Sequence, residues 1–158
     1  MKLQIILLVL FSLINCKCIS QKKENNENRV TSKNVTQIEK IELREQTRGT
    51  NRLITFTKDA VTTYLNGNPS TSQISAADWE SISKQAALLD LSKISTYESS
   101  TTKRFSDGAL ASSITVTANG KTFSSTGFDA GIPPKELEGL YNVLKGKSGS
   151  ITKLPGSR

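Results

Sequence analysis

The feature that most constrains the fold is a hairpin pattern in the second half of the chain. Apolar residues occupy every second position through Ile114 and Val116, which is the period of a β-strand with one buried face. Asn119 and Gly120 follow, and both tolerate the positive φ angles that a type I′ turn requires. The chain then returns through residues 121–125. This pattern predicts two antiparallel strands, and with them an antiparallel sheet.

Three more strands are expected earlier in the chain. Ile41 and Leu43 alternate with charged residues, as in a half-buried strand. Residues 53–57 and 61–65 are rich in β-branched and aromatic side chains, which predicts the second and third strands. The sequence Asn-Gly-Asn-Pro at 66–69 consists of turn-forming residues, so we expect it to end this part of the sheet.

Two helices follow from capping residues and apolar spacing. Ser75 and Asp78 have the spacing of a capping box. The apolar stripe of this helix is Trp79, Ile82, Ala86 and Leu89. We interpret Trp79 as a core anchor, with stacking on a ligand as the alternative. The second helix is expected to begin near Pro134 and to end at Gly146. Its apolar stripe is Leu137, Leu140, Tyr141 and Leu144.

The order of these elements predicts an α+β fold, with an antiparallel sheet of about five strands and two helices packed on one face. A chain of 158 residues accommodates one such domain, which we place at residues 36–145. Residues 21–35 are polar and are expected to form a disordered tether. Residues 146–158 have the same character, so we expect a flexible C-terminal tail.

The first twenty residues are expected to be an export signal. Lys2 precedes an apolar run at 3–14, which is shorter than the roughly 20 residues that span a bilayer. Two processing routes are open. Residues 13–16 resemble a bacterial lipobox, in which a lipid is attached to Cys16, and the other route is signal-peptide cleavage after Ser20. The expected location is therefore the cell envelope, through a lipid anchor in the membrane, or the periplasm or extracellular medium.

Composition excludes several kinds of chemistry. The chain has no histidine, so no imidazole can act as a base or as a metal ligand. Its two cysteines, Cys16 and Cys18, precede the domain and cannot brace it with a disulfide. The net charge of +7 lies toward the two ends, because residues 36–144 carry eleven basic and twelve acidic side chains. We therefore expect no nucleic-acid binding, no enzyme activity, no cofactor and no metal.

The candidate binding residues surround a long polar loop. Residues 91–105 show no sustained period, and an irregular stretch of this length inside a domain is often functional or mobile. Arg104 and Asp107 lie at its end, and Asp129 lies in a second glycine-flanked loop. We expect these three charged side chains to bind a partner. The alternative is that both aspartates are ordinary turn residues next to glycine.

The second half of the domain also resembles a known family. A leucine-rich corner at 88–91, the hairpin at 114–125 and a closing helix at 132–144 occur in this order. The arrangement is similar to small emfourin-like inhibitors of thermolysin-like metalloproteases. Pro134, Leu137 and Leu140 match the closing helix pattern P-x-x-L-x-x-L of that family. The resemblance implies a shared fold, and it transfers no inhibitory residue to this sequence.

These observations predict an exported binding protein that acts on another macromolecule. A protease inhibitor or a toxin-neutralising protein is the concrete form, and the partner is a protein that the sequence does not identify. The rival hypothesis is a structural or accessory envelope lipoprotein without a tight single target. A third hypothesis is an enzyme that uses only carboxylates, such as a glycan hydrolase, with Asp107 and Asp129 on opposite sides of a cleft.

Overall fold

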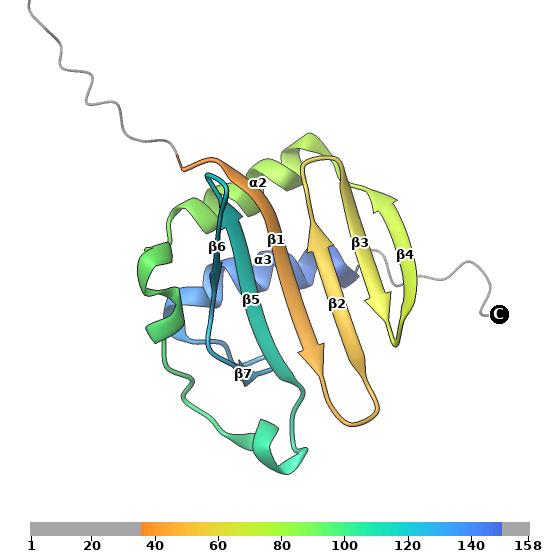
Figure 1. Ribbon diagram of the computed structural model, residues 1–158, viewed down its shortest axis with the longest axis vertical. Coiled ribbons are helices and arrows are strands. Elements are labelled where there is room, and N and C mark those ends of the chain that lie inside the picture. Colours follow the sequence, from red (N-terminus) through yellow and green to blue (C-terminus); the bar gives the residue numbers. More distant parts are fainter. Residues whose placement is uncertain (1–35, 150–158) are drawn as a thin grey trace, which may run out of the picture. The chain divides into compact units, whose positions relative to one another are not determined.

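The computed structural model describes residues 36–149, which form an antiparallel sheet with two α-helices (Figure 1). The sheet has seven strands in the order β4-β3-β2-β1-β5-β6, and β7 pairs with β5. The strands are β1 (Ile38–Gln46), β2 (Asn51–Phe56), β3 (Ala60–Leu65), β4 (Asn68–Gln73), β5 (Ala111–Ala118), β6 (Lys121–Ser124) and β7 (Phe128–Asp129). The first four strands form a meander, and β5 then joins the sheet beside β1.

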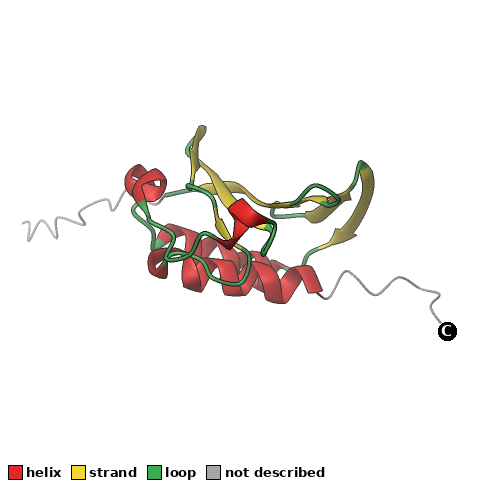
Figure 2. Ribbon diagram, turned by 90° about the horizontal axis from the view of Figure 1, so that it is seen from below, coloured by secondary structure: helices red, strands yellow, loops and turns green. Residues whose placement is uncertain are grey.

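The helices α2 (Ala76–Ala87) and α3 (Glu138–Gly149) lie together on one face of the sheet (Figure 2). Alternate residues of the central strands point toward them and are fully buried, among them Ile41, Leu43, Ile54, Phe56, Ile114 and Val116. The buried core residues all lie between Ile38 and Leu144. The unit formed by residues 35–158 therefore contains the hydrophobic core that these elements share.

The α+β class and the antiparallel sheet agree with the sequence prediction, but the strand count of about five was too low. The expectation that residues 66–69 end the sheet was wrong. Asn66 and Gly67 have φ angles of 51° and 87°, which makes them the turn of a hairpin, and the chain continues directly into β4. Pro69 is tolerated because β4 is an edge strand, where a missing N–H need not disturb a ladder.

The predicted hairpin at Asn119-Gly120 is confirmed. The two residues have φ angles of 49° and 70°, and β5 pairs with β6 on either side of them. The strand β7 was missed because it contains only two residues, Phe128 and Asp129, which is too short for any periodicity. Its pairing with Ser112 and Ala111 is set by the path of the chain around it.

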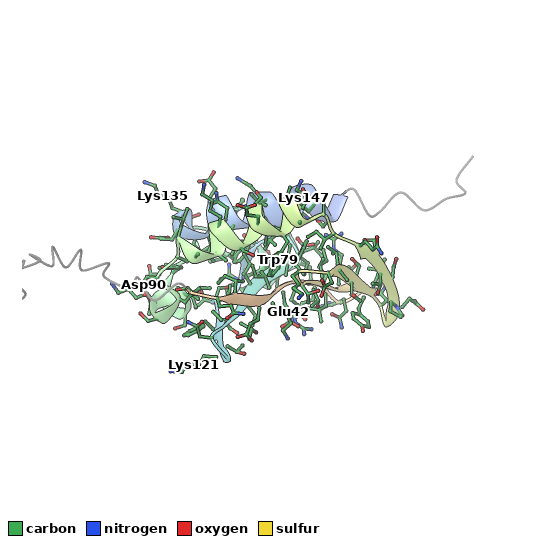
Figure 3. All side chains as sticks on the ribbon, turned by 90° about the horizontal axis from the view of Figure 1, so that it is seen from above. Glu42, Trp79, Asp90, Lys121, Lys135 and Lys147 are labelled. Carbon is green, nitrogen blue, oxygen red and sulfur yellow. The ribbon has the colours of Figure 1, made fainter. Side chains whose placement is uncertain are left out.

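Both predicted helices are present, and the second one extends further than the sequence predicted. The Ser75 hydroxyl accepts a hydrogen bond from the backbone N–H of Asp78 at 3.1 Å, which confirms the predicted cap. Trp79 is half-buried and packs against the core between α2 and the sheet, as expected for an anchor (Figure 3). A 3-10 turn, η3 (Lys135–Leu137), precedes α3. The helical segment therefore begins directly after Pro134, near the predicted start, although its first turn is a 3-10 turn. The helix α3 then continues past Gly146, so the predicted end was wrong.

The stretch predicted as an irregular loop is partly ordered by short 3-10 turns. The first turn is η1 (Leu91–Thr96), in which Leu91 and Ile94 are buried in the core. The second is η2 (Lys103–Ser106). Two buried aliphatic side chains in one six-residue turn fix this segment to the domain, although their spacing does not sustain a longer pattern.

The predicted signal peptide, the polar tether and residues 150–158 of the expected tail lie outside the described residues. Residues 146–149, which we assigned to that tail, belong to α3. Within residues 36–149, none of the helices combines the length and apolar character that are needed to cross a membrane.

Candidate functional site

Asp129 is fully buried on β7 and connects this strand to η2. Its Oδ2 accepts a hydrogen bond from the backbone N–H of Lys103 at 2.8 Å. Its Oδ1 accepts a second bond from the backbone N–H of Arg104 at 2.9 Å. The Arg104 Nη1 lies 3.2 Å from the same oxygen and completes an ion pair. Because both carboxylate oxygens are occupied, Asp129 acts as an anchor for the turn that carries Arg104.

The surroundings of Asp129 favour its ionised form. Burial by itself would raise the pKa of this carboxyl group, because a charge is disfavoured away from water. The Thr101 hydroxyl, the backbone N–H groups of Arg104 and Lys103, and the Arg104 guanidinium outweigh that effect. Together they lower the pKa of Asp129 from 3.8 to about 2. The anchor is therefore charged at neutral pH.

Arg104 fixes the chain on the other side of η2. Its Nη1 donates to the backbone carbonyl of Thr101 at 2.5 Å and to the Ser99 hydroxyl at 3.3 Å. The Arg104 side chain is 13% exposed, so little of it is left for contact with a partner. The Arg104 guanidinium thus connects residues 99–101, which precede η2, with the buried carboxylate of Asp129.

Two further hydrogen bonds close the segment that we call the anchored loop, residues 97–110. The Thr126 hydroxyl donates to the backbone carbonyl of Tyr97 at 2.7 Å. The backbone N–H of Ala130 donates to the carbonyl of Leu110 at 2.9 Å. The loop is held at both ends and in its middle, so its conformation is set before any partner arrives.

Phe105 is presented at the tip of the anchored loop. Its side chain is 78% exposed, which is the highest value among the large hydrophobic residues in the described part of the chain. The Arg104 guanidinium carbon lies 4.4 Å from the centre of the Phe105 ring, in cation–π contact. Since Arg104 is itself held by Asp129, the ring rests against a fixed group while most of its surface faces solvent.

Asp107 lies on the exposed side of the same loop. Its φ angle of 55° ends η2 in the left-handed conformation, which Asp tolerates better than most residues. Its Oδ2 lies 3.2 Å from the Nε of Arg48, which belongs to the turn between β1 and β2 and is 92% exposed. This turn and the anchored loop meet at the same end of the central strands (Figure 1). That end of the sheet therefore presents Phe105 together with charged groups of both signs.

The structure brings two of the three predicted site residues together. Arg104 and Asp129 form a buried pair, whereas Asp107 pairs with Arg48 instead. Cys16, the predicted lipid-attachment residue, lies outside the described residues. Sequence reasoning missed Phe105 and Arg48. A lone aromatic residue within a Ser/Thr-rich stretch was the available signal for Phe105, but nothing local connects Arg48 with the loop.

A second buried carboxylate, Glu45, connects the sheet to α3. It forms ion pairs with Arg52 and with Lys145, whose Nζ lies 3.1 Å from Oε1. The Tyr141 hydroxyl donates to the same oxygen at 3.4 Å and accepts from the backbone N–H of Gly131 at 2.8 Å. Burial raises the pKa of Tyr141, and the Glu45 charge adds to this effect. These contacts give the cluster a structural role, because they join β1 to β2, to α3 and to the turn at Gly131.

An open groove of about 740 Å³ adjoins the start of the anchored loop. It runs between Tyr97 and the segment 131–138, and it carries the carboxylates of Glu98, Glu136 and Glu138. Within residues 36–149, no cluster of three or more side chains could hold a metal ion. The groove lies at the start of the anchored loop and does not include its exposed aromatic tip.

Comparison with known proteins gives no relative for this chain: no family model, no curated protein and no solved structure matches it.

Proposed function

We propose that this chain is an exported binding protein that acts on another macromolecule through the tip of the anchored loop. The observation that carries the proposal is the exposed ring of Phe105. The ring rests on the Arg104 guanidinium, which is fixed by its ion pair with buried Asp129. Aromatic anchors of this kind supply much of the affinity in protein interfaces. A loop whose conformation is already set also loses less entropy on binding than a flexible one.

The partner that suits this tip is a protein with an apolar pocket for Phe105. Asp107, two residues after Phe105, and its partner Arg48 are both exposed and can pair with charged groups at the rim of such a pocket. The concrete form of the proposal is a protease inhibitor or a toxin-neutralising protein. The resemblance of residues 88–144 to emfourin-like inhibitors supports the protease version.

Binding is a better reading than catalysis for the predicted acidic pair. Asp129 is fully buried and both of its oxygens accept hydrogen bonds, so it is not exposed to a substrate. Asp107 is engaged by Arg48 at the surface. A carboxylate-only mechanism needs two groups that act on one bond, and these two serve different partners.

An inhibition assay tests the protease version. Residues 35–158 would be added in micromolar excess to thermolysin, and hydrolysis of a peptide substrate would be followed. We expect inhibition by the original sequence and an inhibition constant raised roughly 30-fold or more by Phe105→Ala. Leu88→Ala is the matched control, because Leu88 is 72% exposed at the end of α2 and should not alter inhibition. No inhibition at this excess would overturn the protease version.

The broader binding proposal is tested by affinity capture from envelope extract and culture fluid. We expect a stoichiometric protein that is retained by the original sequence and by Leu88→Ala, and is lost with Phe105→Ala. A structural envelope lipoprotein, the rival function, would show the same capture pattern for all three baits. That outcome would favour the rival and leave Phe105 without a binding role.

A further inference from the structure

The face of the sheet opposite α2 and α3 carries an ordered array of hydroxyl groups. None of the described helices covers this face, and Glu42 points away from them there (Figures 2 and 3). The strand register places one row of side chains across six strands. In order across the sheet, the row is Thr71, Thr62, Thr55, Glu42, Thr115 and Ser124. Five of its six members are hydroxyl residues.

The hydroxyl groups of this face are already partly ordered by each other. Cross-strand pairs form between Thr62 and Thr71 at 3.1 Å and between Thr115 and Ser124 at 3.0 Å. A third pair joins β5 and β6, where the hydroxyl oxygens of Thr117 and Thr122 are 3.4 Å apart. In each pair one hydroxyl donates to the other, which leaves a second donor and free lone pairs for a ligand. Each pair therefore keeps one free donor and three acceptor lone pairs, which the cross-strand bond holds in place.

An apolar platform lies beside the hydroxyl row. The register aligns Tyr64 of β3 with Leu53 of β2 and with Pro69 of β4. Tyr64 is 43% exposed, so part of its ring can be covered by a ligand. A flat apolar ring next to hydroxyl donors suits a molecule whose own surface alternates between C–H faces and hydroxyl edges.

The charge on this face is small and largely cancelled. Lys40 and Glu42 form an ion pair on it at 3.1 Å. The register adds Arg44, which is exposed beside Leu53. Neighbouring strands are about 4.8 Å apart, so the row repeats a polar residue at that interval over roughly 24 Å. Such a near-neutral array is complementary to a neutral polymer of polar units, and it does not suit a strongly charged one.

From these observations we propose that the open face of the sheet binds an extended, neutral polysaccharide. The chain lies across the strands, with successive sugar hydroxyls paired to the hydroxyl row and one pyranose ring stacked on Tyr64. The site differs from the anchored loop and does not depend on the function proposed for that loop. It would give an exported protein a second attachment, to a glycan of its surroundings.

The test is a titration of residues 35–158 with cellohexaose and with chitohexaose, followed by amide chemical shifts and by calorimetry. A charged oligogalacturonate hexamer serves as the comparison probe. We expect at least one neutral hexamer to bind, with shifts confined to the open faces of β1 to β6 and weaker binding of the charged probe. Tyr64→Ala should lower the association constant roughly tenfold.

Leu65→Ala provides the matched control. Leu65 follows Tyr64 in β3, is 47% exposed and points to the opposite face of the sheet. It should leave binding unchanged, and so should Phe105→Ala, which separates this site from the loop. Thr62→Val combined with Thr115→Val removes two hydroxyls at nearly constant volume and should weaken binding. Absence of binding by both neutral hexamers at millimolar concentration, or shifts that map elsewhere, would overturn the proposal.

Discussion

Two aspartates that look alike in the sequence have opposite environments in the fold. Asp107 and Asp129 each stand close to a glycine in a loop, and both were candidates for contact with a partner. Asp129 is buried and accepts two backbone N–H groups, whereas Asp107 is exposed and ends a short turn. The difference arises from contacts 25 and 26 residues away in the sequence, which local pattern cannot encode.

The buried aspartate should make stability depend on pH in the acid range. The pKa of Asp129 is about 2 in the folded chain and 3.8 in the reference state, so the unfolded chain binds more protons between these values. The free energy of unfolding should therefore fall as pH is lowered from about 4 to 2. Above about pH 4 the stabilisation by Asp129 should be complete. Urea denaturation at a series of pH values measures this dependence.

Asp129→Asn should reduce stability at neutral pH and flatten this acid dependence, because Arg104 loses its anion. Asp107→Asn is the matched control and should leave both unchanged, since its ion pair is exposed. If Asp129→Asn does not fold, the carboxyl carbon of Asp129 can be titrated by NMR in the original sequence. A midpoint near 4 in that titration would contradict the anchor.

At the scale of elements, the two Asn-Gly pairs decide the shape of the sheet. Each pair forms a two-residue turn with positive φ at both positions, and each therefore joins adjacent antiparallel strands. The sequence predicted this outcome at Asn119-Gly120, where alternating residues flank the turn. At Asn66-Gly67 the following strand is polar and almost wholly exposed, so no alternation signals it. At Asn66-Gly67 the turn residues alone predict the hairpin, because the strand that follows has no apolar alternation.

A glycine-to-alanine pair tests the turn geometry. Gly120→Ala should lower the free energy of unfolding by about 1–2 kcal/mol, because its φ of 70° is unfavourable for a residue with a Cβ. Gly49→Ala should change it by less than about 0.5 kcal/mol, since no atom lies within 4 Å of the added carbon and no positive φ is required. Thermal or urea unfolding compares the two. Equal effects would contradict the assigned turn.

At the scale of the whole molecule, the second helix defines where the domain ends. The helix α3 continues through Gly146 to Gly149, and an ion pair joins its last turn to α2. The Nζ of Lys147 lies 2.5 Å from the Oδ1 of Asp78 on α2, which lowers the pKa of Asp78 together with the Ser75 hydroxyl. Two helices that are joined at their ends in this way act as one layer against the sheet.

Truncation at the two alternative boundaries tests this description. A chain of residues 35–149 should keep the stability of residues 35–158, whereas residues 35–145 should lose roughly 1 kcal/mol through the missing turn and ion pair. Lys147→Met in the longer chain isolates the ion pair and should cost less than the truncation. Equal unfolding free energies for residues 35–145 and 35–149 would show that the domain ends at the predicted boundary.

The features that depend on neighbouring residues could be predicted from the amino-acid order alone. The cap at Ser75, the buried stripes of α2 and α3, and the hairpin at Asn119-Gly120 each arise from spacings of two to four residues. These local periods are sufficient to predict an α+β fold with an antiparallel sheet. They also locate the polar loop, although not the 3-10 turns that order it.

Contacts between residues that are distant in the chain depend on how the elements pack in the folded domain. Pairing of β5 with β1, burial of Asp129 beneath η2, and contact between Arg48 and Asp107 all join segments that are far apart in the chain. The presentation of Phe105 depends on that same burial, because the Arg104 guanidinium beneath the ring pairs with Asp129, 25 residues away, as well as with Ser99 and Thr101 nearby. Such contacts form when apolar faces pack and buried charges find partners, and local pattern does not specify the partner.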